Sequence, residues 1–252
     1  MCCFSRPVRL VADTNIFARA SKDGRQFLVY SMRLDAAEDL AMILPIPVPA
    51  KPPEDAVKFI NLEKYPEFFA HMRRGFPSPP PPKSAGRSII KSEAKKSTLE
   101  VVNVGSFEAS FVPSVADFDR LDDRFRLPSG VWDQLPQYRD FGFAVFKLKR
   151  GNQKVHPMAF EFPRARRNEL FFPTVHIHDG TVKPQARFHH DLYCQRSGDE
   201  SLMAWKESPG IASSFIKKME DAQGIVDPDG HCYRREMRGV FANEDVKVEP
   251  EV

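Results

Sequence analysis

Prolines are spread along this chain at a density that leaves little room for long helices. The sequence has 22 prolines in 252 residues, and each proline removes a backbone donor and clashes with the preceding turn of a helix. There are also 21 phenylalanines against 5 tyrosines, which indicates aromatic side chains that need no hydrogen-bond partner in the core. We therefore expect many strand ends and loops around an aromatic core.

Several segments alternate or concentrate apolar residues in the way that strands require. Residues 15–20 and 26–34 flank an Asp23-Gly24 pair, which is a strong hairpin signal. Residues 39–48 predict a third strand. Further strands are predicted at residues 99–104, 105–112, 140–149, 157–162, 169–178, 186–194 and 231–241.

Helical patterns are fewer. Short or broken helical stretches are predicted at residues 53–76, 117–124 and 131–138. The clearest helix is predicted at residues 210–224, where Ile211, Phe215 and Met219 recur every four residues and Gly224 suits a helix C-terminus.

The chain divides by composition into four parts. Residues 1–76 predict a β-rich N-terminal lobe, residues 77–98 a mobile loop rich in Pro and Lys, and residues 99–242 a C-terminal α+β lobe. Residues 243–252 form an acidic tail that we expect to fray. The predicted fold class is α+β: a predominantly antiparallel or mixed sheet with a few short packing helices, divided into two lobes.

The loop at residues 77–98 holds the excess positive charge. Its five basic residues stand against Glu93, a net charge of +4, whereas the whole chain carries +3. No basic stripe remains elsewhere, so nucleic acid is not expected as a partner. The loop is either an ordinary insertion or a proline-rich ligand through which a protein partner binds.

The cysteines and the apolar runs of the sequence indicate the cellular compartment in which we expect the protein. Adjacent Cys2 and Cys3 cannot bond each other without strain, and the N-terminus shows no charged segment followed by an apolar run, as an export signal would. No apolar stretch approaches the roughly 20 residues that span a bilayer. We therefore expect a cytoplasmic protein without a disulfide framework or membrane contact.

Histidines concentrate in one part of the chain, since five of the seven fall between positions 156 and 190. Residues 169–178 and 186–194 predict a hairpin with its turn at Asp179-Gly180. His176 and His178 are two apart on the first strand, so both imidazoles point to one face.

The second strand of this hairpin offers two alternative ligand sets. Alternation places His190 and Cys194 on one face and His189 and Asp191 on the other, and the register decides which set joins the first strand. His156, on a preceding strand, could add a ligand. Such a set suits Zn, Cu or Fe, although no standard spacing such as Cys-x-x-Cys occurs. The alternative is a sheet face whose histidines bond to water and neighbours.

Cys2 is the second candidate for chemistry. Removal of the initiator methionine would give Cys2 a free α-amine that could act as base for its own thiol, as in N-terminal-nucleophile hydrolases. Asn15, Arg19 and Arg25 could then hold an oxyanion or a carboxylate. The alternatives are that the two adjacent cysteines are small buried residues of the first strand, or that one of them ligates a metal beside the histidines.

The order of motifs resembles an uncharacterised bacterial domain family. A cysteine near the start, the Leu-Pro-Ile-Pro segment at 44–47, the Val-Gly-Ser-Phe segment at 104–107, and residues 142–149 and 156–162 follow the family's order. Members typically carry an export signal, and the histidine-rich stretch is not part of their pattern. The family has no established activity, so the resemblance implies a fold and no mechanism.

Three function classes stay open. A metal-binding protein using the His/Cys cluster is the most testable; a non-catalytic binding or scaffolding protein and a Cys2 amidohydrolase are the alternatives. Because no phosphate loop, dinucleotide fingerprint or nucleophile elbow occurs, the sequence does not decide whether the chain is an enzyme, and it identifies no small-molecule ligand.

Overall fold

Strands dominate this protein, whose computed structural model describes residues 3–77, 102–105, 107–128, 130–196 and 202–248. Strands take up 47% of the described residues and helical turns 15%. Among the described residues there is one α-helix, α1 (Phe68–Arg74), besides short 3-10 turns, and no helix is long and apolar enough to cross a membrane. The expected α+β class is therefore wrong, and the fold is β-rich.

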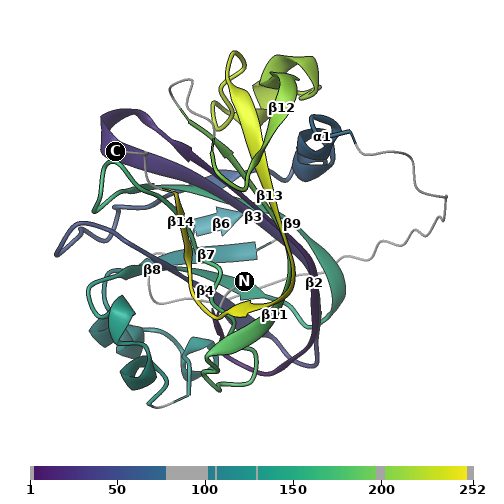
Figure 1. Ribbon diagram of the computed structural model, residues 1–252. Helices are drawn as coiled ribbons and strands as arrows, with labels where there is room; N and C mark the ends of the chain where they lie inside the picture. Colours follow the sequence, from purple (N-terminus) through teal and green to yellow (C-terminus); the bar gives the residue numbers. More distant parts are fainter. Residues whose placement is uncertain (1–2, 78–101, 106, 129, 197–201, 249–252) are drawn as a thin grey trace.

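Two large sheets form the body (Figure 1). The first contains β2 (Val8–Ala20), β3 (Arg25–Ala36), β5 (Lys58–Asn61), β9 (Gly151–Pro163), β11 (Gln185–Gln195), β12 (Lys206–Ile211) and β13 (His231–Ala242). The second contains β1 (Cys3–Phe4), β4 (Leu40–Ile46), β6 (Val102–Val104), β7 (Phe107–Val112) and β8 (Gly142–Leu148). A small third sheet pairs β10 (Leu170–Phe172) with β14 (Val246–Val248).

The strand order interleaves the two halves of the chain. The seven-stranded sheet runs β12-β13-β11-β2-β3-β9-β5, and the five-stranded sheet runs β1-β4-β8-β7-β6. Neighbouring strands are antiparallel, except that β11 and β2 are parallel. Each sheet thus combines strands from residues 1–76 with strands from beyond residue 99, and one core lies between them.

The predicted hairpin at Asp23-Gly24 joins β2 to β3. Asp23 and Gly24 both have positive φ, 59° and 72°, which is the conformation that a tight Asp-Gly turn needs. Ala20 pairs with Gln26 directly beyond the turn. The short local signal therefore sets the register of the two central strands.

The main core lies between the two large sheets. Alternate residues of each strand point into it, so that Tyr30 of β3 and Met42 of β4 are both buried in one cluster. Phe146 stands at its aromatic centre, with its ring centroid 5.7 Å from that of Phe107 and 5.9 Å from that of Phe160. This confirms the expectation of a phenylalanine-rich core.

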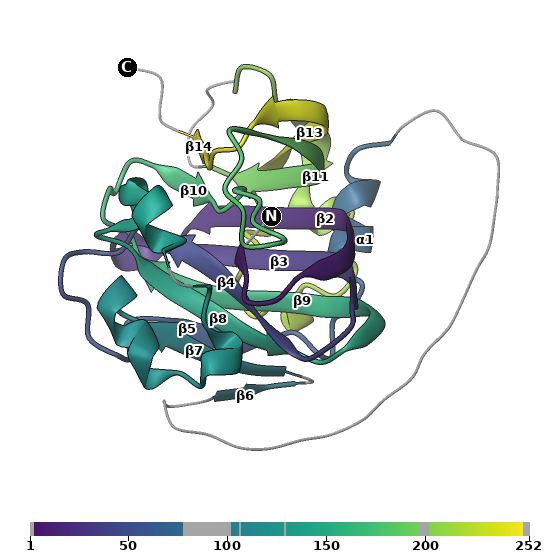
Figure 2. The same cartoon turned by 90° about the horizontal axis from the view of Figure 1, so that it is seen from below.

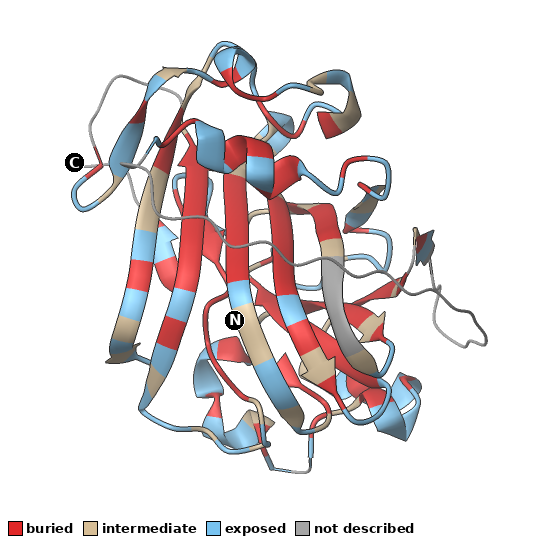
Figure 3. Ribbon diagram, turned by 90° about the vertical axis from the view of Figure 1, so that its right-hand side faces the viewer, coloured by how far each residue is buried: buried red, intermediate tan, exposed pale blue. Residues whose placement is uncertain are grey.

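Each outer face has a cover of its own. Phe17 and Tyr193 on the outer face of the seven-stranded sheet pack with Phe68 of α1 and Phe215. The 3-10 turns within residues 115–138 cover the outer face of the five-stranded sheet and lie beside β7 and β8 (Figure 2). Cover by α1 is partial: buried residues give way to exposed ones toward one end of the seven-stranded sheet (Figure 3).

The helix predicted at residues 210–224 does not form. β12 continues to Ile211, and the backbone N–H groups of Ala212 and Ser213 donate to the carbonyls of Gly230 and Pro228, both at 2.9 Å. Beyond β12 the segment forms only two separate 3-10 turns, Ala212–Ser214 and Glu220–Ala222. Ile211 is 38% exposed whereas Phe215 is buried, so the four-residue recurrence does not mark one buried helical face.

The acidic tail also differs from expectation. Val246–Val248 form β14 against β10 instead of fraying. Asp245 fixes this end, because its Oδ1 accepts from the Thr174 N–H at 2.8 Å and its Oδ2 accepts from the Tyr138 hydroxyl at 2.6 Å.

Candidate functional site

The two histidine-bearing segments do not form the predicted hairpin. β10 ends at Phe172, and β11 pairs with β13 and β2 instead of with β10. Residues 173–176 lie outside the strands. Side chains bond to part of their backbone, since Asn243 Oδ1 accepts from the His176 N–H at 2.7 Å. Pro173 further disfavours a longer strand because it has no N–H to donate.

His176, His178 and His190 nevertheless lie together. The Nε2 atoms of His176 and His190 are 3.2 Å apart. The rings of His176 and His178 stack with their centroids 5.2 Å apart. His190 projects from β11 into the space between the sheets, which makes it the member of the 189–190 pair that joins the cluster.

Burial keeps these three histidines uncharged. Removal from water lowers the pKa of His176 to about 2 and that of His178 to about 4, and it holds the pKa of His190 well below its ordinary value. The His178 Nε2 and His190 Nδ1 atoms are buried without a hydrogen-bond partner among the described residues. A neutral imidazole with an unused nitrogen is also the form in which histidine binds metals.

The other three predicted metal ligands lie elsewhere. Cys194 is four residues from His190 along β11, about 13 Å at the usual strand rise. His189 points to the opposite face, where its Nδ1 is 4.0 Å from Asp13 Oδ1. His156 stacks on Phe107, with ring centroids 4.3 Å apart. Across the described residues, no group of three or more His, Cys, Asp or Glu side chains has the arrangement of a metal site.

The start of the chain reaches the histidine cluster. Cys2 lies outside the described residues, but Cys3 forms a parallel bridge with Ile177, the residue between His176 and His178. The neighbouring Phe4 N–H donates to the Ile177 carbonyl at 3.0 Å. The β1 strand and the histidine segment therefore run side by side.

The residues expected to assist Cys2 do not gather. Arg19 donates to the Ile225 carbonyl at 2.6 Å, and Arg25 pairs with Glu161 at 3.1 Å. Asn15 lies on the outer face of the seven-stranded sheet, among arginines that the sequence did not single out.

Comparison with known proteins identifies the fold. The chain is similar to the crystal structure of baculovirus P35, with a TM-score of 0.52 and 13% identity over 98% of this chain and 99% of that chain. It is also similar, with TM-scores of 0.45 and 13% identity, to a mutated baculovirus P35 after caspase cleavage and to a chain of the caspase-8/P35 complex. These cover 94% of this chain, and 98% and 96% of the respective chains. No family model and no curated protein matches.

Proposed function

We propose that this chain acts by binding another protein, a protease of the caspase type, and catalyses no reaction itself. The similarity of fold to baculovirus P35, which extends over 98% of this chain, carries the proposal. Solved structures of P35 include a complex with caspase-8 and a mutated form after caspase cleavage. The class of partner follows from this similarity of fold.

The three described cysteines are poorly placed for nucleophilic catalysis. Cys3, Cys194 and Cys232 are all fully buried. Burial raises the pKa of the Cys232 thiol to about 12 and moves that of Cys194 in the same direction. Since the thiolate is the reactive form, none of these three thiols is suited to attack a substrate.

The loop at residues 77–98 is the segment through which we propose that the partner binds. Beyond Pro77 it lies outside the described residues, and its composition supports this role. Four consecutive prolines favour an extended conformation that binds at low entropic cost, and a net charge of +4 favours an acidic partner surface.

Size-exclusion chromatography with caspase-8 tests this proposal. We expect the full chain to co-elute with the protease, and we expect a variant whose residues 78–97 are replaced by a Gly-Ser linker of equal length to elute separately. A variant that lacks residues 249–252 is the matched control and should still co-elute. Separate elution of the full chain from caspase-8 would refute the proposed partner, and co-elution of the linker variant would refute the proposed segment.

Metal binding is the second candidate function, and the separation of His176 and His190 favours it. Two nitrogens that share one tetrahedral Zn²⁺ at about 2.0–2.1 Å lie roughly 3.3 Å from each other, and the two Nε2 atoms are 3.2 Å apart. The pair is thus spaced as two ligands of one ion would be.

Elemental analysis of purified, untagged protein tests the metal candidate. About one Zn, Cu or Fe per chain should be present and should be lost in His176→Ala/His178→Ala. His189→Ala, which alters the outward-facing neighbour of His190, should retain it. A metal content near zero in the unaltered protein, or the same content in all three proteins, would refute this candidate.

A further inference from the structure

The outer face of the seven-stranded sheet turns from apolar to polar beyond α1. Tyr193 of β11 still packs against Phe69, with ring centroids 6.0 Å apart. The next residues of β11 on the same face are Asp191 and His189. The register pairs Tyr193 with Arg234, Asp191 with Glu236, and His189 with Arg238. Two arginines of β13 therefore flank Asp191 diagonally.

Asp191 fixes these two arginines. Its Oδ1 accepts from Arg234 Nη2 at 2.9 Å and from Arg238 Nη2 at 2.8 Å. The side chains of Asp191 and Arg234 are only 10% and 11% exposed, and Arg234 Nε is buried without a hydrogen-bond partner among the described residues. Asp191 thus holds two guanidinium groups, and Arg234 Nη2 also pairs with Glu236 Oε1 at 2.9 Å.

A third arginine, Arg73 of α1, reaches the same place and bonds to Asn15, which follows a bulge in β2. The pairing of β2 with β3 shifts between Ala12 and Asn15, and Asp13 within the bulge has a φ of 52°. The Asn15 amide donates to the Asp13 carbonyl at 2.7 Å, and its Oδ1 accepts from Arg73 Nη2 of α1 at 3.2 Å. Bulges and strained residues of this kind re-aim side chains and concentrate at binding sites.

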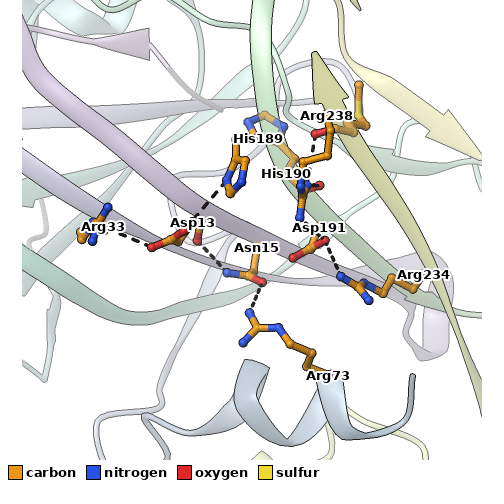
Figure 4. Close-up of polar contacts among 10 residues, drawn as sticks. Asp13, Asn15, Arg33, Arg73, His189, His190, Asp191, Arg234 and Arg238 are labelled. Atoms are coloured by element: carbon orange, nitrogen blue, oxygen red, sulfur yellow. Dashed lines mark hydrogen bonds and ion pairs between the residues drawn. The ribbon is translucent and has the colours of Figure 1, made fainter. Parts of the chain in front are cut away.

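These groups surround a cavity of about 560 Å³, a volume typical of small-molecule sites, which range over about 300–1,000 Å³. Figure 4 shows polar residues of its lining, which come from β2, β3, β11, β13 and α1. Four arginines and two aspartates line it, and Pro66, Phe69 and Met32 add an apolar wall. Its lining therefore carries an excess of two positive charges.

We propose that this cavity binds a small organic anion through a phosphate or carboxylate group. Arg73 is the residue that points most directly to this ligand class, because it donates to a neutral carboxamide rather than to a carboxylate. The fork of a guanidinium matches the two oxygens of a phosphate or carboxylate. The site lies on the opposite face of β11 from His190 and does not depend on the proposed protein partner.

Isothermal titration of the full chain at low salt with inorganic phosphate, adenosine monophosphate and citrate tests this proposal. We expect saturable binding of at least one of them at one site per chain. Tighter binding of adenosine monophosphate than of phosphate would identify a nucleotide-like ligand, and tighter binding of citrate a polycarboxylate. Raising the salt concentration should weaken binding because the attraction is electrostatic.

Two neighbouring arginines of α1 provide a matched pair of variants. Arg73→Gln should weaken binding by roughly tenfold or more, the loss expected when a hydrogen bond to a charged group is removed. Arg74→Gln removes an equal charge from an exposed position that does not line the cavity and should leave binding unchanged. If Arg73→Gln does not fold, Arg33→Gln inside the cavity and Arg9→Gln outside it make a second pair. Absence of saturable binding by all three probes, or equal weakening in both members of a pair, overturns the proposal.

Discussion

His176 and His190 face each other with 3.2 Å between their Nε2 atoms, although they belong to segments that do not pair as strands. One of these nitrogens donates the hydrogen and the other accepts it, so the contact requires that at least one of the two rings is neutral. Burial favours the neutral state of both, because it lowers the pKa of His176 to about 2 and that of His190 well below its ordinary value. The folded protein therefore keeps His176 and His190 neutral at a mildly acidic pH at which exposed histidines would be protonated.

This burial should make the protein sensitive to acid. Unfolded histidines titrate near pH 6.5, so below that pH the unfolded state binds more protons and the free energy of unfolding falls. The free energy of unfolding should begin to fall near pH 6.5. It should fall by up to about 1.4 kcal/mol per pH unit for each fully buried histidine. The fall should continue past pH 4, where His178 titrates in the folded state.

Urea denaturation between pH 7.5 and 4.5 measures this dependence. His190→Gln should show a shallower slope than the unaltered protein, whatever its absolute stability. His189→Gln, a change at the adjacent outward-facing residue, should leave the slope as it is. Identical slopes in all three proteins would contradict the assignment of His190 as a buried neutral group.

The aromatic core between the sheets should depend strongly on Phe146. Its ring is fully buried and contacts those of Phe107 and Phe160, so Phe146→Ala should lower the free energy of unfolding by about 3–5 kcal/mol. Met203 is 84% exposed, and Met203→Ala should have little effect. Thermal and chemical denaturation of both variants compares them, and similar losses would contradict this position of the core.

Asp191 should contribute to stability as well as to the charge of the cavity. Asp191→Asn leaves two arginines together without their shared carboxylate, which should cost roughly 3 kcal/mol. Asp179→Asn removes an exposed carboxylate that pairs with Lys183 at 3.8 Å and should change stability little. An Asp191→Asn variant as stable as Asp179→Asn would show that the two arginines do not need this carboxylate.

Asp245 should hold the tail in place. Asp245→Ala removes the acceptor of the Thr174 and Val175 N–H groups, which donate to it at 2.8 and 3.2 Å. Hydrogen exchange at these two amides should become faster, whereas Glu244→Ala, a change at the neighbouring residue, should preserve their protection. Unchanged protection in Asp245→Ala would contradict the anchoring role.

The sequence predicted those parts of the fold that depend on local geometry. The Asp23-Gly24 pair favours a positive-φ turn that suits a hairpin, and the turn forms as predicted. The alternation of apolar residues in 140–149 correctly predicted the strand β8. The helix at 210–224 failed because β12 extends to Ile211, which is 38% exposed, while Phe215 is buried by residues distant in sequence. Apolar spacing alone does not determine which backbone conformation a segment adopts.

In the candidate sites, too, short sequence patterns predict some placements, whereas others depend on packing between distant segments. Proximity of His176 to His178 follows from two-residue spacing, whereas the approach of His190 depends on β11 pairing with β2 and β13, which no short pattern encodes. Arg234 and Arg238 are four residues apart on a predicted strand, so the sequence could predict that they share a face. It could not predict that Arg73 of α1 lies beside them, because that depends on how α1 packs on the sheet.

Binding of caspase-8 to the immobilised full chain measures the proposed interaction itself, with the variant carrying the Gly-Ser linker immobilised beside it. We expect a saturable binding curve for the full chain and a loss of that curve for the linker variant. A response that stays at baseline for the full chain up to micromolar protease, in protein shown to be folded by its cooperative unfolding, would contradict the claim that this chain acts by binding such a protease.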